Sequence, residues 1–389
     1  MHATVLSKLV SADHQVAIFD RCEDVPAHCF EALVPSENVL HRPAYLDVLE
    51  QWGRSHGVGF YYCVVDWDGA PGIFCLFQTR SLKVGDIVRS NRFDKLWNAF
   101  PLRILMCGNM MVSGAPGIMC RDDVPANVAA ELMIAAAKAL QQHIAQRFDV
   151  LILKDVPPAV AAHTTTFRSA GYEPLQIEPA MTLRIKPNWH CFDDYLLDLR
   201  TRYRRKTKRI RRQSEGIDRR VLSVAEASRR LPELESLYNQ VYDRAALQGP
   251  HIGASFFLTL RQRLKTSEFD LIGYFQGEDL LAFSSRFHVN NAVVAYFFGL
   301  DYRFNRKYSL FHNLLYDDIE CAINVGAHEL NFGRTTHEVK SSVGAIPDDL
   351  PSFFLPLRPM SRPLCWLVQA LWRVPQWIAC HPFRCTDLP

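Results

Sequence analysis

The side chains best suited to chemistry gather in one short stretch of the chain, residues 331–345. Arg334, His337, Glu338 and Lys340 fall within seven residues there, between two glycines. An imidazole titrates near neutral pH and can take up a proton, and a carboxylate can do so where burial raises its pKa. Guanidinium and ammonium groups bind phosphate or carboxylate and can stabilise an oxyanion. The stretch is therefore our first candidate for proton transfer and anion binding.

Two interpretations of this stretch stay open. It follows the apolar run 329–332, which is typical of a short buried strand, and polar turns after such strands often carry function. Thr335 or Thr336 followed by Glu338 is also the pattern of a helix N-cap, so the stretch could be a solvated helix start. We expect His337 or Glu338 to act as base or to orient an amine, and Arg334 to bind an anion.

The elements that must position these residues follow the same order in both halves of the chain. Apolar runs and turn signals predict a hairpin, a helix and further strands in each half. The first half has the hairpin 60–77, the helix 128–146 and strands at 148–153 and 181–185. The second has the hairpin 269–287, a strand at 292–298, the helix 309–325, and strands at 329–332 and 353–357. This repeated order predicts an α/β fold of two tandem domains, with mixed sheets flanked by helices.

The composition excludes several classes of protein. Of the 389 residues 48% are hydrophobic and 22% are charged, and the net charge of +3 gives no strong overall field. The 11 cysteines form no Cys-x-x-Cys pair and no Cys/His grouping with zinc spacing, so we expect reduced thiols, no metal site and a cytoplasmic protein. We recognise no signal peptide and no apolar run long enough to span a bilayer.

A strongly basic segment joins the two halves. No glycine or proline interrupts residues 195–215, which favours a helix. Its basic residues cover most of the circumference, so the helix needs an anionic partner, an acidic neighbour or water. A single interleaved aromatic, Tyr203, argues against reading of bases. Phosphate contact and a solvated linker remain the two alternatives.

The order of the second half, together with this basic segment, resembles a GNAT-type acyltransferase. More narrowly, it resembles the branch that holds the CelD-like proteins and the Fem aminoacyl transferases. The resemblance covers residues 192–357 well and residues 38–185 by layout only. The segments that carry it are 199–216, 295–300, 308–315, 322–326 and 332–340 with Gly344.

The resemblance implies an activated acyl donor bound at the start of the helix 309–325. In typical GNAT enzymes a glycine-rich loop binds the donor's pyrophosphate there, whereas this chain has basic residues and no glycine at 302–309. We therefore expect side chains to hold the phosphate. The expected donor-binding residues are Arg303, Arg306, Lys307, Tyr308, Ser309 and Lys340, and those expected near the acceptor are Tyr296, Asp301 and His251.

The sequence thus predicts an N-acyltransferase with domains at 1–187 and 188–360 and a Trp-rich tail at 361–389. Acyl-CoA is the favoured cosubstrate, no cofactor is expected to bind tightly, and the acceptor is an amine of a polar metabolite or of an envelope or polysaccharide precursor. The alternatives are a Fem-like enzyme that uses aminoacyl-tRNA and a catalytically silent scaffold. For the amphipathic stretch 364–380 we favour docking on the protein body over contact with the inner membrane or a second subunit.

Overall fold

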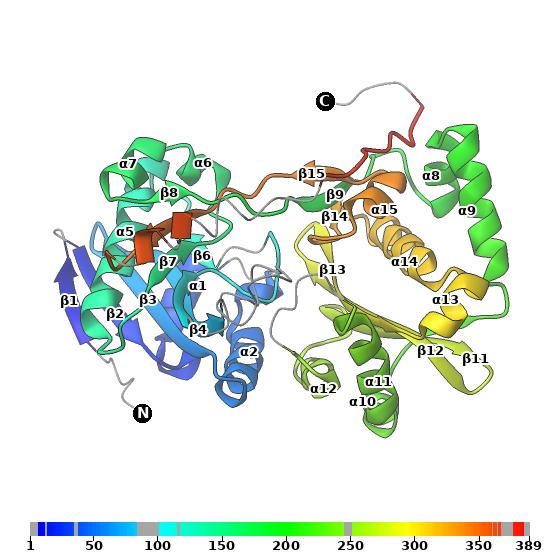
Figure 1. Cartoon of the computed structure of the whole chain (residues 1–389), viewed down its shortest axis with the longest axis horizontal. Coiled ribbons are helices and arrows are strands. Elements are labelled where there is room, and N and C mark those ends of the chain that lie inside the picture. Colours follow the sequence, from blue (N-terminus) through cyan, green and yellow to red (C-terminus); the bar gives the residue numbers. More distant parts are fainter. Residues whose placement is uncertain are drawn as a thin grey trace. The chain divides into compact units, whose positions relative to one another are not determined.

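In the computed structural model the chain folds into two units, each completed by a segment from the other half of the sequence (Figure 1). The first unit comprises residues 1–178 and 349–375, and the second comprises residues 179–348 and 376–389. The structure describes residues 7–11, 14–34, 38–83, 101–114, 117–244, 251–359, 361–363, 365–366 and 376–384.

The first unit is a mixed sheet flanked by helices. Its strands follow the order β1-β2-β3-β4-β5-β7-β16-β8, with β6 paired to β4, and only β5 and β7 run parallel. The strands are β1 (Ser7–Ser11), β2 (His14–Phe19), β3 (Gly59–Trp67), β4 (Ala70–Lys83), β5 (Pro101–Cys107), β6 (Ile118–Cys120), β7 (Val150–Leu153), β8 (Glu173–Pro174) and β16 (Phe353–Pro356). The helices are α1 (Ala27–Leu33), α2 (Pro43–Ser55), α5 (Ala126–His143), α6 (Pro158–Ala161) and α7 (Thr164–Ser169), with short 3₁₀ turns at Cys22–Asp24 and Val39–His41.

Local sequence signals explain the β3–β4 hairpin and the helix α5 of this unit. The predicted hairpin forms between β3 and β4, because Asp68 (φ 52°) and Gly69 (φ 77°) adopt the left-handed conformation that a tight hairpin turn requires. The predicted helix forms as α5, whose Leu132, Met133 and Leu140 are fully buried in the core of the unit. Its many alanines allow the helix to approach β1–β4 closely.

The second unit is also a mixed sheet, with strands in the order β10-β11-β12-β13-β14-β9-β15, and only β13 and β14 run parallel. Helices α10, α11 and α12 lie on one face, and α13 and α14 lie on the other (Figure 1). The strands are β9 (Ala180–Arg184), β10 (Asp218–Val221), β11 (Phe269–Gln276), β12 (Asp279–Val289), β13 (Ala292–Leu300), β14 (Glu329–Asn331) and β15 (Ile346–Asp348). The helices are α8 (Phe192–Asp198), α9 (Thr201–Gln213), α10 (Val224–Arg229), α11 (Leu231–Tyr242), α12 (Ala254–Arg263), α13 (Tyr302–Tyr308), α14 (Leu310–Asn324) and α15 (His337–Ser342).

The predicted helix at 309–325 is confirmed as α14. Leu310, Leu314, Ile319 and Ile323 are all buried, as their spacing along one face predicts. Gly326, at φ 68°, follows the end of the helix and adopts a conformation that suits glycine.

The boundaries of the two units differ from those expected at residues 187 and 360. The predicted strand 181–185 forms as β9 but pairs with β14 and β15 of the second sheet. The predicted strand 353–357 forms as β16 but pairs with β7 and β8 of the first sheet. The chain therefore passes between units at Glu178/Pro179 and at Asp348/Asp349, and it crosses again at Pro375/Gln376. A short apolar run specifies a strand but not its partner, so the expected boundaries followed chain order instead.

The basic segment is two helices and not the single helix expected at 195–215. Leu199 and Arg200 have extended backbone between α8 and α9. The break is held by the C-terminal segment, because Leu199 forms a β-bridge with Phe383 and the N–H of Arg200 donates to the carbonyl of Pro382. A contact with residues so distant in sequence cannot be recognised from local helix propensity.

The described residues 376–384 of the tail dock on the second unit, and Ser361 and Cys365 pack on the first, in line with the docking that the sequence favoured. Trp377 stacks on His337, and Phe383 packs against Trp189 and Tyr195. Trp366 is 56% exposed, whereas Trp372 lies outside the described residues. Within the residues that the structure describes, we find no helix both long and apolar enough to cross a membrane.

Gly299 of β13 permits close packing of α11 on the sheet. A Cβ atom at this position would lie 2.6 Å from the carbonyl carbon of Leu237 and 2.7 Å from the amide nitrogen of Tyr238. Since backbone cannot move aside as a side chain can, we expect Gly299→Ala to lower the free energy of unfolding by about 2 kcal/mol in urea denaturation. Gly216→Ala is the matched control, because nothing lies within 4 Å of its Cβ position. Equal effects of the two substitutions would contradict this account.

Candidate active site

In the sheet of the second unit, the parallel strands β13 and β14 separate partway along β13. This strand pairs in parallel with β14 only at Ala292, Val293 and Val294, and then continues to Leu300. Among the described strands, none pairs with residues 295–300 on the β14 side. In the first unit the corresponding parallel pair, β5 and β7, stays in register to Cys107 and Leu153, the last residues of both strands. The opening is thus a feature of the second sheet.

The turn between α13 and α14 lies directly after β13. The stretch expected to replace a glycine-rich loop forms the short helix α13, and Asp301 is its N-cap and accepts from the N–H of Arg303 at 2.9 Å. Ser309 then reverses the chain in the left-handed conformation (φ 49°). Asn313 Nδ2 donates to the carbonyls of Tyr308 (2.9 Å) and Ser309 (3.2 Å). These bonds fix the turn at the N-terminus of α14.

The basic residues of α13 divide into two kinds. The Arg303 guanidinium holds both carboxylate oxygens of Asp301, at 2.6–3.0 Å, and its hydrogen bonds lower the pKa of that carboxyl group. Arg306 and Lys307, in the last turn of α13, are exposed, with the Lys307 Nζ 4.7 Å from the centre of the Tyr308 ring. Of the predicted donor-binding residues, Arg306 and Lys307 are therefore best placed to meet a phosphate, whereas Tyr308 is buried.

Ser309 and its neighbours connect this turn to the basic helix α9. The Ser309 hydroxyl donates to Gln213 Oε1 at 2.8 Å, at the end of α9. The N–H of Phe311, in the first turn of α14, is taken by Asn305 Oδ1 at 3.0 Å. The N–H of Phe311, one of the groups at the start of α14 that could bind an anion, is therefore already hydrogen-bonded within the protein. A phosphate at this turn would consequently depend more on side chains.

The segment between β14 and α15 is strained. Gly333, Thr335 and Thr336 all have positive φ values, of 69°, 70° and 49°. For a β-branched residue such as threonine this conformation is an outlier that the surroundings must enforce. Thr336 occupies the N-cap position of α15, but its side chain makes no capping hydrogen bond. The helix start suggested by the sequence exists, without the expected capping chemistry.

Lys340 helps to hold this strained segment. Its side chain is buried, and its ammonium group donates to the carbonyls of Gly333 (3.2 Å) and Arg334 (2.6 Å). The structure thus gives Lys340, which the sequence suggested as a donor ligand, a role in fixing the turn. Arg334 is half-buried in the same turn.

His337 and Glu338 begin α15 and differ in environment. His337 is 5% exposed, its ring stacks on Trp377, and its Nε2 lies 3.2 Å from the carbonyl oxygen of Pro179, just before β9. A hydrogen bond at that distance places the proton on Nε2 and leaves Nδ1 as the basic nitrogen. Glu338 is exposed.

An aromatic cluster joins Tyr296 with His251, two of the residues expected near the acceptor. The Tyr296 ring contacts Phe257, which contacts Tyr238, whose ring lies 5.2 Å from that of His251. His251 Nε2 lies 2.6 Å from Asn239 Oδ1 and 3.6 Å from Glu235 Oε1. The third, Asp301, is held in its pair with Arg303.

The helix α9 exposes most of its basic side chains. Thr207 and Ile210 are buried beneath it, and Arg211 pairs with Asp317 and Glu320 on α14. The exposed basic residues for which the described structure shows no carboxylate partner are Arg202, Arg205, Lys208, Arg209 and Arg212. An acidic neighbour, one of the alternatives that the sequence left open, thus exists for Arg211.

His312, in the first turn of α14, was missed by the sequence reasoning. Burial and the nearby Lys206 ammonium group lower the pKa of His312 to about 4, so its imidazole is neutral at pH 7. It lies in the stretch 308–315 that carried the resemblance, but a histidine among apolar residues gives no signal of its own. A neutral imidazole at this turn can accept or donate a hydrogen bond.

The comparisons with known proteins agree with this architecture. Residues 198–341 match the family described as an acetyltransferase (GNAT) domain. The second unit is a GNAT-type acyltransferase domain. No curated protein sequence matches the chain.

Among solved structures, a crystal structure of FemX has a TM-score of 0.55 at 12% identity, and the match covers 85% of this chain and 94% of that one. A conserved protein of unknown function from Bacteroides thetaiotaomicron has a TM-score of 0.50 at 11% identity, covering 87% and 98%. A tandem GNAT protein from the clavulanic acid biosynthesis pathway has a TM-score of 0.46 at 11% identity, covering 80% and 88%. The match over residues 198–341 agrees with the GNAT-type resemblance of the second half, and the likeness to FemX shows a shared fold.

Replacement of Thr336 by glycine should stabilise the protein. Glycine adopts positive φ without the steric cost of a Cβ atom, so we expect Thr336→Gly to raise the free energy of unfolding by about 1 kcal/mol. Thr336→Ala is the matched control, because it removes the hydroxyl and keeps the Cβ atom. Urea denaturation of both variants measures the difference. If alanine stabilised as much as glycine, backbone strain at Thr336 would not be the cause.

His312 should contribute a pH dependence to stability. Its pKa in the folded protein, about 4, lies below the value of 6.5 in the unfolded chain, so the unfolded state takes up the proton first. This contribution is complete above about pH 6.5 and is lost as the pH falls towards 4, by roughly 3 kcal/mol in total.

We therefore expect His312→Gln to flatten the fall in unfolding free energy between pH 6.5 and 4.5. The control is His190→Gln, which changes an exposed histidine. Chemical denaturation at a series of pH values measures both variants. Parallel pH profiles of the wild type and His312→Gln would contradict the assignment.

Proposed function

We propose that the second unit transfers an activated acyl group, with acyl-CoA as the favoured donor, to an amine of a polar metabolite or of an envelope or polysaccharide precursor. The observation that carries the proposal is that β13 pairs with β14 only as far as Val294, although the strand continues to Leu300. Peptide groups at an open strand edge can hydrogen-bond an extended ligand that carries amides of its own, as the pantetheine arm of CoA does. An acyl-CoA donor agrees with a cytoplasmic enzyme.

The phosphates of the donor would lie at the turn before α14. The N-terminus of a helix carries partial positive charge, and exposed Arg306 and Lys307 add two full charges beside it. Arg303 is less available, since Asp301 already occupies its guanidinium group. Ser309 and Tyr308 would shape the turn.

The reaction needs the acceptor amine to attack the acyl carbonyl, the bond to the donor's sulfur to break, and the amine's proton to leave. We assign the proton to His337 Nδ1, because Nε2 is engaged with the carbonyl of Pro179. Exposed Glu338 would orient the amine, and Arg334 would steady the oxyanion or bind an acidic group of the acceptor. Tyr296 and His251, joined by the aromatic cluster, would line the acceptor side. Alignment of the two substrates supplies much of the acceleration in such a reaction.

One observation favours a second candidate, in which aminoacyl-tRNA is the donor. Exposed Arg202, Arg205, Lys208 and Arg209 give α9 a basic surface suited to a phosphate backbone. A silent scaffold is the third candidate, and it needs neither donor.

Donor binding separates these candidates. We expect the double variant Arg306→Ala/Lys307→Ala to weaken CoA and acetyl-CoA binding by at least about 10-fold in calorimetry, because each lost charge-assisted hydrogen bond costs more than 1 kcal/mol. The matched control, Arg205→Ala/Lys208→Ala, removes the same charge from α9 and should leave CoA binding unchanged.

Binding of tRNA gives the opposite pattern. If aminoacyl-tRNA were the donor, Arg205→Ala/Lys208→Ala would bind tRNA more weakly than the wild type and with a smaller dependence on salt. CoA would then bind neither the wild type nor this variant. Indifference of the wild type to CoA, acyl-CoA and tRNA alike would favour the scaffold and overturn the proposed transferase.

A further inference from the structure

A hollow of about 520 Å³ lies in the second unit, away from the candidate active site. It is formed where β12 ends, β13 begins and α14 ends. The active-site features lie at the other ends of β13 and α14. The 15 residues of α14 rise roughly 22 Å, so the two places are well separated. The hollow therefore needs an account of its own.

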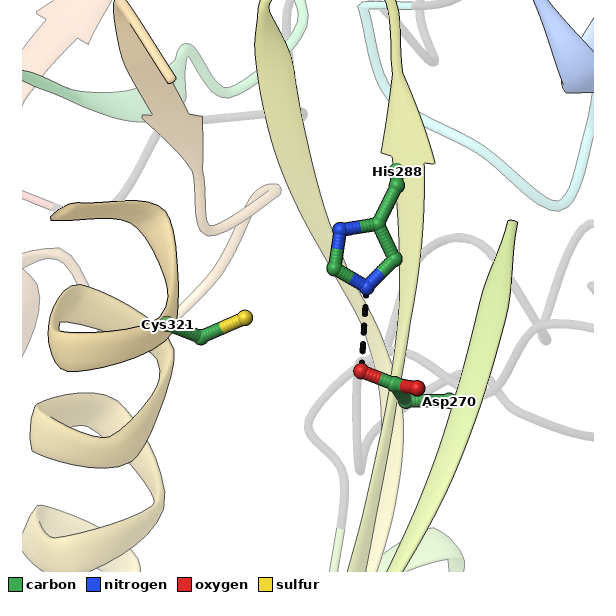
Figure 2. Close-up of side chains that lie close together, drawn as sticks. All are labelled: Asp270, His288 and Cys321. Carbon is green, nitrogen blue, oxygen red and sulfur yellow. Dashed lines mark hydrogen bonds and ion pairs between the residues drawn. The ribbon is translucent and has the colours of Figure 1, made fainter. Parts of the chain in front are cut away.

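Three side chains of different elements meet at this hollow (Figure 2). Asp270 comes from β11, His288 from the neighbouring strand β12, and Cys321 from α14. One ligand atom of each, a carboxylate oxygen, an imidazole nitrogen and the thiol sulfur, lies within 4.8 Å of the other two. His288 Nε2 lies 3.0 Å from Asp270 Oδ2, and the Cys321 sulfur points towards the same imidazole (Figure 2).

The sheet register explains why the first two residues meet. Asp270 stands opposite Arg286, and His288 follows two residues later on the same face of β12. The helix α14 packs against β12 and brings Cys321 over this pair. None of these spacings is visible as a motif, since the three residues span more than 50 positions of sequence.

The electrostatic surroundings permit a cation. Arg286 is the positive neighbour, with its Nε 3.2 Å from Asp270, but Asp318 offsets its charge at 3.1 Å from Nη1. The C-terminal end of α14 adds partial negative charge. Asn290 and Asn291 supply further polar groups to the lining.

We propose that Asp270, His288 and Cys321 bind one divalent cation of the zinc type, with a fourth position that faces the hollow. Nitrogen, sulfur and oxygen donors from three side chains are a set that zinc accepts. Ligand atoms around a tetrahedral zinc ion stand about 3.5 Å apart, so the three atoms, which lie within 4.8 Å of one another, need only small shifts to reach that geometry. On binding, the thiol of Cys321 loses its proton to solvent. The proton that His288 Nε2 donates to Asp270 moves to Nδ1 through solvent, so the metal replaces that hydrogen bond and binds Nε2.

The cation would act on stability. It would connect β11 and β12 to α14. The other end of this helix carries the turn at residues 302–309 where we place the donor's phosphates, called the donor turn below. A ligand that binds the folded state and not the unfolded chain raises the melting temperature, and the rise grows with the affinity and the free concentration of the ligand. The proposal is independent of the acyl donor, because the site shares no residue with the donor turn.

The test uses the full chain, stripped with chelator and titrated with Zn²⁺ or Co²⁺. We expect one ion per chain, a rise in melting temperature, and a sulfur-to-cobalt charge-transfer band in the near ultraviolet. Cys321→Ser should abolish the band and weaken Zn²⁺ binding by at least about 10-fold, and His288→Gln should weaken binding similarly. Cys191→Ser, which removes an exposed thiol from the start of α8, should leave all three readouts unchanged.

The metal-free melting temperatures show whether each variant folds, and they make a lost metal response interpretable. Zn²⁺ binding that is equal in the wild type, Cys321→Ser and His288→Gln would overturn the proposal, as would the absence of any binding. Alkylation of Cys321 by iodoacetamide much faster than of Cys191, without metal binding, would assign the cluster instead to a reactive thiol assisted by His288 and Asp270.

Discussion

Backbone hydrogen bonding to β9 is the constraint on which the second unit depends. This strand comes from the first half of the repeated pattern, yet it lies between β14 and β15 and pairs with both. The N–H of Phe332 donates to Met181, and the N–H of Met181 donates to Gly333, so the pairing continues into the candidate site segment. Pro179, just before β9, accepts from His337. Together with Lys340, β9 therefore fixes the position of the strained turn and of α15.

The two units show how one architecture can carry different capacities. In both, two parallel strands lie near the middle of a mixed sheet, β5 with β7 and β13 with β14. The first pair stays in register to the ends of both strands, so its peptide groups are satisfied within the sheet. The second pair parts after Val294 and leaves half of β13 open. The difference lies in the length of pairing, so the open strand edge belongs to the second unit, where the GNAT family match also lies.

The family and the elements were accessible from sequence because they rest on local information. Hairpin turns such as Asp68–Gly69 and the apolar face of α14 need only nearest neighbours along the chain to specify them. The candidate site was accessible only in part. The segment at Arg334–Lys340 does follow a strand, but the sequence suggested a donor contact for Lys340, whose ammonium group instead holds two carbonyls of its own turn. His312 gave no signal, because its lowered pKa arises from burial by residues distant in sequence.

The sequence by itself determined which segments become strands and helices, because side-chain periodicity and turn residues act over a few positions. Only the tertiary structure decided which strand joins which sheet, where the basic segment breaks, and which polar groups meet. Strand pairing, the β-bridge of Leu199 with Phe383 and the meeting of Asp270, His288 and Cys321 all join distant positions. Such contacts depend on how the apolar faces pack together, and no short pattern in the chain records that outcome.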